Sequence, residues 1–102
     1  MNDRNEYIGS PEIHDGKIIS LIKENDNLVV NIQSYEGKNF VIKFINIKEI
    51  KSNNPENMVL YGLVKENFKE NLKKYIFSNW DEDGNQFLEI IAEGYETMKT
   101  NT

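Results

Sequence analysis

The sequence predicts a single domain built mainly from antiparallel β-strands. Apolar and polar residues alternate with a period of two over several short segments, and turn-forming residues separate those segments. The chain has 102 residues, the usual size of one domain, and 38% of them are hydrophobic, which is enough for a core. We expect six to seven strands, arranged as a sandwich or as one strongly curved sheet, with at most one short helix.

The first 33 residues are expected to supply two strands. Residues 1–12 form an irregular lead-in, because Gly9-Ser10-Pro11 favours a turn. The segment 17–23 is rich in β-branched residues, and 24–27 has the composition of a turn. Residues 28–33 then alternate strictly, as in a half-buried strand.

A third strand follows the turn at 35–38, because residues 40–45 alternate again. Three strands joined by short turns form an antiparallel meander, since parallel strands need crossovers of a dozen residues or more. Residues 45–50 either extend this strand or form a short edge strand. The segment 52–56, with Pro55, breaks the pattern.

Both faces of the next segment, 58–65, are apolar. Met58, Leu60 and Val64 share one side, and Val59, Tyr61 and Leu63 share the other. This pattern predicts a central strand covered on both faces. In the segment 66–74, Phe68 and Leu72 lie four residues apart, which is compatible with one or two helical turns. Another strand is expected at 74–80, followed by a turn at 81–85 with Asp-Gly chemistry.

Two interpretations fit residues 86–98. As a strand ending at Glu93, the segment points Leu88, Ile90 and Ala92 inward. As a helix, it gathers one apolar stripe and closes a seven-strand barrel, as in pleckstrin-homology-like domains. Gly94 and the turn before the segment favour the strand. Residues 97–102 are expected to form a frayed tail.

Charge and composition limit the kinds of function that we expect for this chain. The chain contains no cysteine, which excludes disulfides and a cysteine nucleophile. Neither a signal-peptide pattern nor an apolar run of about 20 residues is visible, so we expect a cytoplasmic protein without a membrane span. The net charge is −5, and residues 75–98 carry six acidic and no basic side chains. Such a run is usually a solvated face, but it can also attract a basic partner.

Candidate chemical sites are few. Asp81-x-Asp83-Gly84-Asn85 resembles the start of an EF-hand loop, but Gln86 and Ala92 stand where that loop needs glycine and glutamate. We therefore expect no metal site and no cofactor. The one histidine, His14, lies beside Glu12 and Asp15, and an enzymatic role would depend on it. Without a second histidine or a nucleophile motif, the chain is expected to be non-catalytic.

Nucleic-acid binding is not expected either. The chain has one arginine and a negative net charge, and the phenylalanines near its lysines occupy core positions.

A second apolar face is the most informative pattern. If Leu28, Phe40, Leu60, Phe77 and Leu88 face the core, the opposite face carries Val29, Val41, Ile45, Tyr61, Ile76, Trp80 and Ile91. Either a second layer of the same chain covers that face, or a partner does. We expect residues Tyr61, Ile76, Trp80, Asp81 and Asp83 to form an interaction surface, with a two-fold homodimer as the simplest occupant.

The resulting hypothesis is a non-catalytic binding or protein-interaction domain, such as one that masks a basic partner in the manner of an immunity protein. A small-ligand or lipid site in an internal cavity is one alternative. An enzyme that uses His14 is another, and it would need His14 in a cleft beside a carboxylate.

Several short segments resemble small uncharacterised bacterial proteins of toxin-immunity-like or unknown-function families. They are His14-Asp15-Gly16-x-Ile18, Leu28-Val29-Val30, Phe44, Met58-x-Leu60-Tyr61 and Leu88-Glu89-Ile90-Ile91-Ala92. This resemblance implies an all-β or α+β scaffold without known catalytic residues, so it transfers no site.

Overall fold

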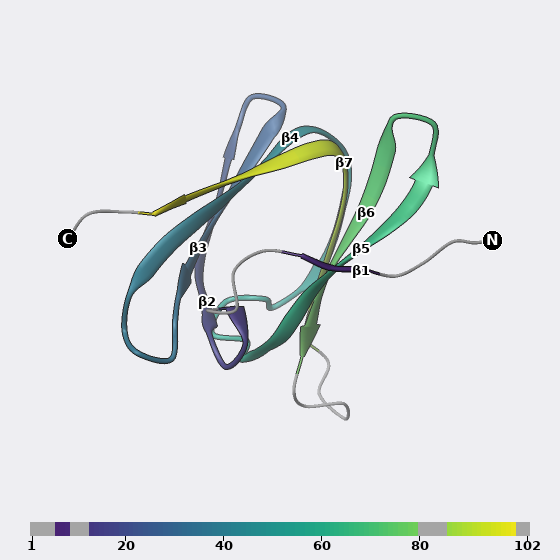
Figure 1. Ribbon diagram of the computed structural model, residues 1–102. Helices are drawn as coiled ribbons and strands as arrows, with labels where there is room; N and C mark the ends of the chain where they lie inside the picture. The colour runs from purple at the N-terminus through teal and green to yellow at the C-terminus, as the bar shows by residue number, and fades with distance from the viewer. Residues whose placement is uncertain (1–5, 9–12, 80–85, 100–102) are drawn as a thin grey trace.

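The computed structural model shows one antiparallel sheet of seven strands (Figure 1). It describes residues 6–8, 13–79 and 86–99, and no α-helix occurs among them. The strands are β1 (Glu6–Ile8), β2 (Lys17–Glu24), β3 (Asn27–Gln33), β4 (Asn39–Asn53), β5 (Leu60–Lys69), β6 (Leu72–Asn79) and β7 (Phe87–Lys99). Their order in the sheet is β1-β5-β6-β7-β4-β3-β2. The expectation of a mainly β domain with a strongly curved sheet is confirmed.

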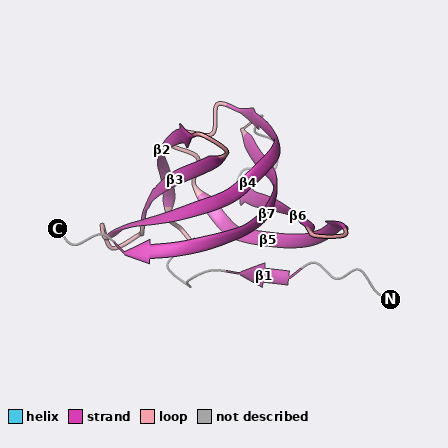
Figure 2. Cartoon of the chain, turned by 90° about the horizontal axis from the view of Figure 1, so that it is seen from above, coloured by secondary structure: helices cyan, strands magenta, loops and turns pink. Residues whose placement is uncertain are grey.

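The two longest strands, β4 and β7, fold the sheet over on itself (Figures 1 and 2). They pair antiparallel from Phe40–Lys99 to Asn53–Phe87. A β-bulge shifts the register between Ile47 and Glu49, and bulges bend and twist the strand that carries them. We call this bend the corner. It makes one half of the sheet face the other.

Asn46 and Gly94 lie at the corner. Asn46 has a positive φ of 53°, a conformation that asparagine tolerates better than most residues. Its side-chain amide donates a hydrogen bond to the Glu93 carboxylate at 3.0 Å, and its backbone N–H donates to the Asn27 side chain at 3.1 Å. Ile47 N–H donates to the Asp26 carbonyl at 2.7 Å. The β2–β3 turn therefore braces the corner.

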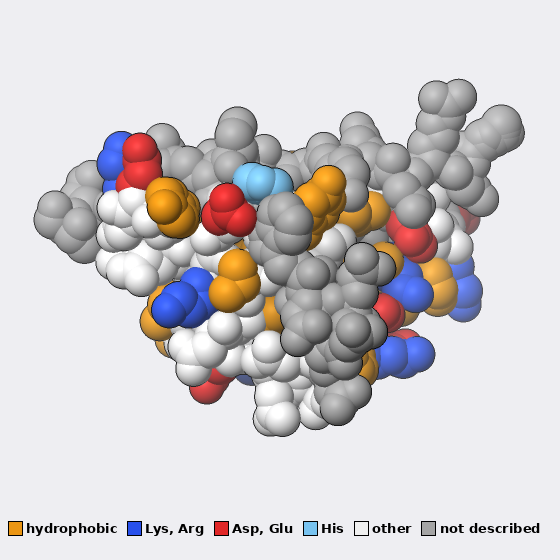
Figure 3. All heavy atoms as spheres, turned by 90° about the horizontal axis from the view of Figure 1, so that it is seen from below, with side chains coloured by type: hydrophobic (Ala, Val, Ile, Leu, Met, Phe, Trp, Pro, Cys, Tyr) orange, Lys and Arg blue, Asp and Glu red, His pale blue; other side chains and the backbone are white. Residues whose placement is uncertain are grey.

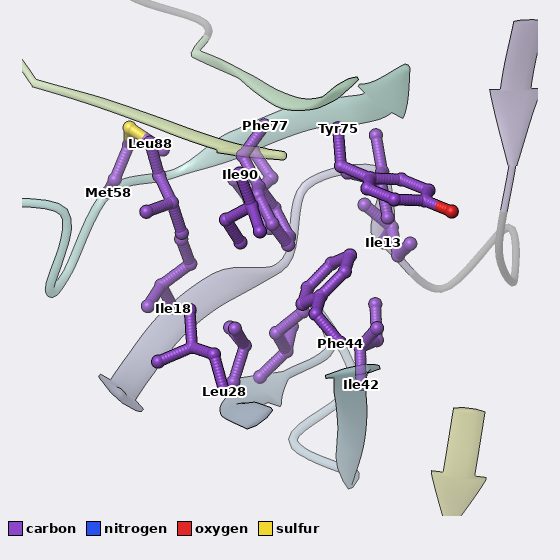
Figure 4. Close-up of a cluster of buried hydrophobic side chains, with 14 of the residues drawn as sticks. Ile13, Ile18, Leu28, Ile42, Phe44, Met58, Tyr75, Phe77, Leu88 and Ile90 are labelled. Carbon is purple, nitrogen blue, oxygen red and sulfur yellow. The ribbon is translucent and has the colours of Figure 1, made fainter. Parts of the chain in front are cut away.

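The core lies between the two halves of the folded sheet (Figure 4). Phe44 is its centre, with ring centroids 5.0 Å from Tyr75, 5.8 Å from Phe77 and 6.4 Å from Tyr95. The side chains expected to face inward are all buried, namely Leu28, Phe40, Leu60, Phe77 and Leu88.

The two ends of the sheet meet without forming a continuous ladder. Lys17 of β2 makes an isolated antiparallel bridge with Val59, just before β5. Four backbone hydrogen bonds surround it: Ile18 N–H to Met58 O (3.2 Å), Asn57 N–H to Ile18 O (2.7 Å), Leu60 N–H to Gly16 O (2.8 Å) and Asp15 N–H to Leu60 O (2.8 Å). We call this junction of residues 15–18 with 57–60 the seam. The sheet curls towards a barrel, but strand pairing does not close it.

Neither the short helix considered at 66–74 nor the alternative helix at 86–98 is present among the described residues. The segment 66–74 is a hairpin, in which Lys69 pairs with Leu72 across a turn that contains Asn71 at a φ of 68°. Residues 87–99 form β7, so the barrel closed by a C-terminal helix is wrong, and Leu88, Ile90 and Ala92 point inward as the strand interpretation required. The strand continues beyond Glu93 to Lys99, because its second half pairs with Phe40–Ile45. Residues 97–99 are therefore not a frayed tail.

Other element boundaries differ as well. Residues 6–8 of the expected irregular lead-in form β1, which pairs with β5. β4 runs through to Asn53 as one strand. In β5, a bulge between Leu60 and Gly62 reverses the expected sides, so that Leu63 joins the core and Val64 points outward.

The outer face has no second layer in the part of the chain that the structure describes. Val41, Val64 and Ile91 on this face are nevertheless buried, with exposures of 7%, 8% and 8%. Ile13 and Leu21 pack against the core, so they do not cover this face. No helix among the described residues is long and apolar enough to cross a membrane.

Candidate interaction surface

Exposed apolar side chains gather on the outer side of the seam. Since Ile18, Met58 and Leu60 point into the core, their neighbours along the chain point outward. Ile19 is 43% exposed, Val59 45% and Tyr61 42%. Across the seam, Val59 faces Lys17, and Tyr61 follows Leu60, whose carbonyl accepts a hydrogen bond from Asp15 N–H. We call Asp15, Lys17, Ile19, Val59 and Tyr61 the seam patch.

His14 lies at the edge of the seam patch, and apolar side chains are visible on both sides of it in Figure 3. Its Nδ1 is 3.0 Å from the backbone carbonyl of Tyr61. A carbonyl oxygen can only accept, so Nδ1 carries the proton of this hydrogen bond. The imidazole also contacts the Tyr61 ring edge-on at 5.4 Å. His14 thus fastens the turn at 13–16 to the beginning of β5.

The chemistry available to His14 is limited by its surroundings. Its Nε2 is 3.9 Å from the Asp15 carboxylate, and the two side chains are 52% and 47% exposed. Glu12, the other expected neighbour, lies outside the described residues. Among the residues that the structure describes, no group of three or more potential ligands could hold a metal ion. The Asp15 carboxylate thus lies next to the imidazole at an exposed turn.

The predicted interaction residues do not form one described cluster. Tyr61 belongs to the seam patch, whereas Ile76 is half-buried opposite Val64 on the outer face of β5 and β6. Trp80, Asp81 and Asp83 lie outside the described residues, as does the turn that resembles an EF-hand loop.

The acidic side chains of β7 do not form an unbalanced patch. Glu89 forms an ion pair with Lys74 at 3.4 Å and lies opposite Lys51 in the sheet. Glu96 lies opposite Lys43. Opposite charges directly across a sheet attract each other. The lysines of β4 and β6 therefore balance these acids, and a charge-based attraction for a basic partner would depend on residues 81–83.

A small hollow lies on the outer face of the sheet, remote from the seam. Glu49, Lys51, Phe68, Lys74, Glu89 and Ile91 line it, and its volume is about 120 Å³. Pockets for small ligands usually enclose about 300–1,000 Å³. This hollow is too small for the alternative of a small-ligand site.

The core contains one buried ionisable group. Tyr75 is 2% exposed, and its ring contacts Tyr95 at 5.6 Å. Burial, and then the nearby Tyr95 hydroxyl, raise the pKa of Tyr75 above its ordinary value of 10.0. None of the hydrogen bonds among the described residues involves its hydroxyl. Tyr75 therefore stays neutral and serves mainly as a core side chain.

Ile19 and Val59 were not among the interaction residues expected from the sequence. Each lies in a short β-type segment, where a single outward apolar residue is ordinary. They become one patch only because the seam brings together two segments some 40 residues apart in the chain.

Comparisons with known proteins do not add a function. The chain matches no protein-family model, no curated protein and no solved structure. The resemblance to small bacterial proteins therefore stays an expectation.

Proposed function

We propose that this chain is a non-catalytic protein-interaction domain that binds its partner through the seam patch. The observation that carries the proposal is the exposure of Ile19, Val59 and Tyr61, each more than 40% exposed, on two segments that the seam holds side by side. Exposed apolar patches on soluble domains commonly mark binding surfaces.

The composition of the seam patch supports a protein partner. Its centre is apolar and includes a tyrosine, a residue type enriched among the side chains that dominate binding energy. Asp15, Lys17 and His14 supply polar groups at its rim. An apolar centre with a polar rim is the usual anatomy of a protein–protein interface. Because one acid and one base lie in the patch, the proposal depends on apolar burial rather than on the partner's net charge.

A matched pair of substitutions tests this proposal. Val59 is 45% exposed within the seam patch, and Met98 is 46% exposed on β7, outside it. Val59→Asp and Met98→Asp place the same charge at equally exposed positions, so both variants should keep the wild-type circular dichroism spectrum. Each protein is immobilised and exposed to lysate of the native organism, and the retained proteins are identified by mass.

We expect one protein to be retained by the wild type and by Met98→Asp, but not by Val59→Asp. Light scattering of the eluted samples shows whether that protein is a second copy of this chain, which would establish the expected homodimer. Equal retention by all three proteins, or no specific retention by any of them, would contradict the proposal.

A further inference from the structure

Within the part of the chain that the structure describes, backbone hydrogen bonds occupy the first half of the outer edge of β2 and leave the second half open. β2 is the last strand of the described sheet, where it pairs with β3. At the start of β2, the seam uses both backbone groups of Ile18, whose N–H donates to Met58 and whose carbonyl accepts from Asn57. No backbone hydrogen bond among the described residues joins β2 to the residues before Asn57.

The second half of β2 presents backbone groups along the same edge that have no partner among the described residues. In an antiparallel strand, successive residues direct their N–H and C=O groups alternately to the two sides. Glu24 pairs with Asn27 across a two-residue turn, so Lys23 and Leu21 direct theirs away from β3. The bulge at Ile19 inserts one extra residue into β2, so the N–H and C=O groups of Ile18 also point away from β3. The two N–H groups and two carbonyls of Leu21 and Lys23 therefore continue the row that the seam begins.

A hollow of about 490 Å³ borders this unpaired edge. Leu21 lines one side, and Ser52 and residues 54–57 line the other. The loop wall is held in place, because the Gln86 side-chain amide donates to the carbonyls of Asn54 at 2.9 Å and Glu56 at 3.4 Å. Pro55 is buried and its carbonyl accepts from Met58 N–H at 3.1 Å. The loop wall of this open groove is thus largely preformed.

We propose that this hollow receives an extended peptide segment of the partner protein, which adds a strand to β2 at Leu21 and Lys23. This inference rests on the proposed function and specifies how the partner is held. An extended peptide carries N–H and C=O groups at the spacing that the unpaired edge requires, as in other complexes that add a strand to a sheet. The added strand lies in line with residues 57–60 and continues the seam.

The neighbouring side chains specify the peptide further. A residue opposite Leu21 points inward against an apolar side chain that packs on the core. Ile22 lies on the outer face and is 49% exposed. A peptide residue opposite Ile22 would lie beside this side chain, and an apolar residue there would bury the most apolar surface. Among the described residues that line the hollow, Glu56 alone carries a charge. The peptide is therefore extended, with apolar residues on both faces and a lysine or arginine near Glu56.

A phage-displayed library of ten-residue peptides, selected on the wild-type protein, supplies the probe. Lys23→Pro removes one outward N–H, and proline is tolerated in an edge strand where that N–H faces solvent. Lys23→Ala removes the side chain but keeps the N–H. We expect selected peptides with the stated pattern to lose at least tenfold in affinity on Lys23→Pro, and less than threefold on Lys23→Ala.

Amide hydrogen exchange of the wild-type protein provides a second measurement that needs no variant. Bound peptide should slow exchange at Leu21 and Lys23 at least tenfold. A peptide that binds without slowing these amides, and that is lost on Val59→Asp, would overturn strand addition but leave the proposed function intact. Failure to select any peptide, or a second copy of the chain paired along β2, would also overturn it.

Discussion

The corner and the seam join the same sheet in different ways. At the corner, β4 and β7 pair over most of their lengths, and hydrogen bonds from Asn46 and Ile47 tie the bend to the β2–β3 turn. At the seam, one isolated bridge and four backbone hydrogen bonds join β2 to residues 57–60. The longest strand pairing of the sheet thus lies at the corner, and the exposed apolar side chains gather at the seam.

This difference assigns the corner mainly to the stability of the fold and the seam to partner binding. A region held by long strand pairing and a packed core is costly to alter, whereas a short junction leaves unpaired backbone and uncovered side chains at its border. The edge of β2 is also protected against indiscriminate pairing by its bulge at Ile19 and by the charges of Lys23 and Glu24. The seam is therefore the part of the molecule best suited to recognise a partner.

Phe44→Ala should have the largest effect on stability. The phenyl ring is fully buried at the start of the corner, among Tyr75, Phe77 and Tyr95. Its removal should lower the free energy of unfolding by about 3–5 kcal/mol, a typical cost for a phenylalanine in a packed core. Urea denaturation measures this loss. Val59→Ala at the seam should cost less than about 0.5 kcal/mol, and equal losses at the two positions would contradict the comparison.

Asn46→Ala should have an intermediate effect. Alanine disfavours the positive φ of 53° at this position and cannot donate to Glu93, so we expect a loss of about 1–2 kcal/mol. Asn46→Gly keeps access to the left-handed conformation and serves as the control. Urea denaturation of both variants should show glycine as the milder change. If alanine were as well tolerated as glycine, the backbone at the corner would not require this conformation.

His14→Ala should have a small effect. It removes one exposed hydrogen bond to the Tyr61 carbonyl and an edge-on ring contact, which together contribute about 0.5–1 kcal/mol. Chemical denaturation again provides the measurement. A loss of several kcal/mol would mean that the seam contributes as much to the fold as the corner does.

Tyr75→Phe should have the smallest effect at neutral pH, because it removes a hydroxyl without a hydrogen-bond partner among the described residues. Its effect should appear only in alkali. The pKa of Tyr75 is raised in the folded protein, so above pH 10 the unfolded chain releases this proton first and folding stability falls as the pH rises. Denaturation at pH 8–11 should show a shallower decline for Tyr75→Phe than for the wild type. Parallel curves would contradict the raised pKa.

The alternation of apolar and polar residues predicted the strands correctly where it has a strict period of two. It gave the β2–β3–β4 meander and the inward side chains of Leu88, Ile90 and Ala92 correctly. It failed where one residue interrupts the period. Because of the bulge near Tyr61, Leu63 points into the core and Val64 points outward, the reverse of the expectation. Asn71, with a positive φ, lies in the turn of a hairpin where the spacing of Phe68 and Leu72 was compatible with a helix.

The seam patch was beyond local prediction for another reason. Tyr61 was expected to interact through its apolar character, but its neighbours in the patch, Ile19 and Asp15, come from a distant segment. The corner at Asn46 and Gly94 decides whether the sheet curls far enough to bring those segments together. A bend of this kind depends on tertiary packing and carries only a weak signal in one sequence.

Amide hydrogen exchange of the free protein tests the half-occupied edge of β2 most directly. The Ile18 amide donates to Met58 across the seam, whereas the Leu21 and Lys23 amides lie on the unpaired part of the same edge. We expect slow exchange at Ile18 and exchange at least tenfold faster at Leu21 and Lys23, over a range of protein concentrations. Equal protection of all three amides in the monomeric protein would show that the edge is already paired and that no strand can be added there.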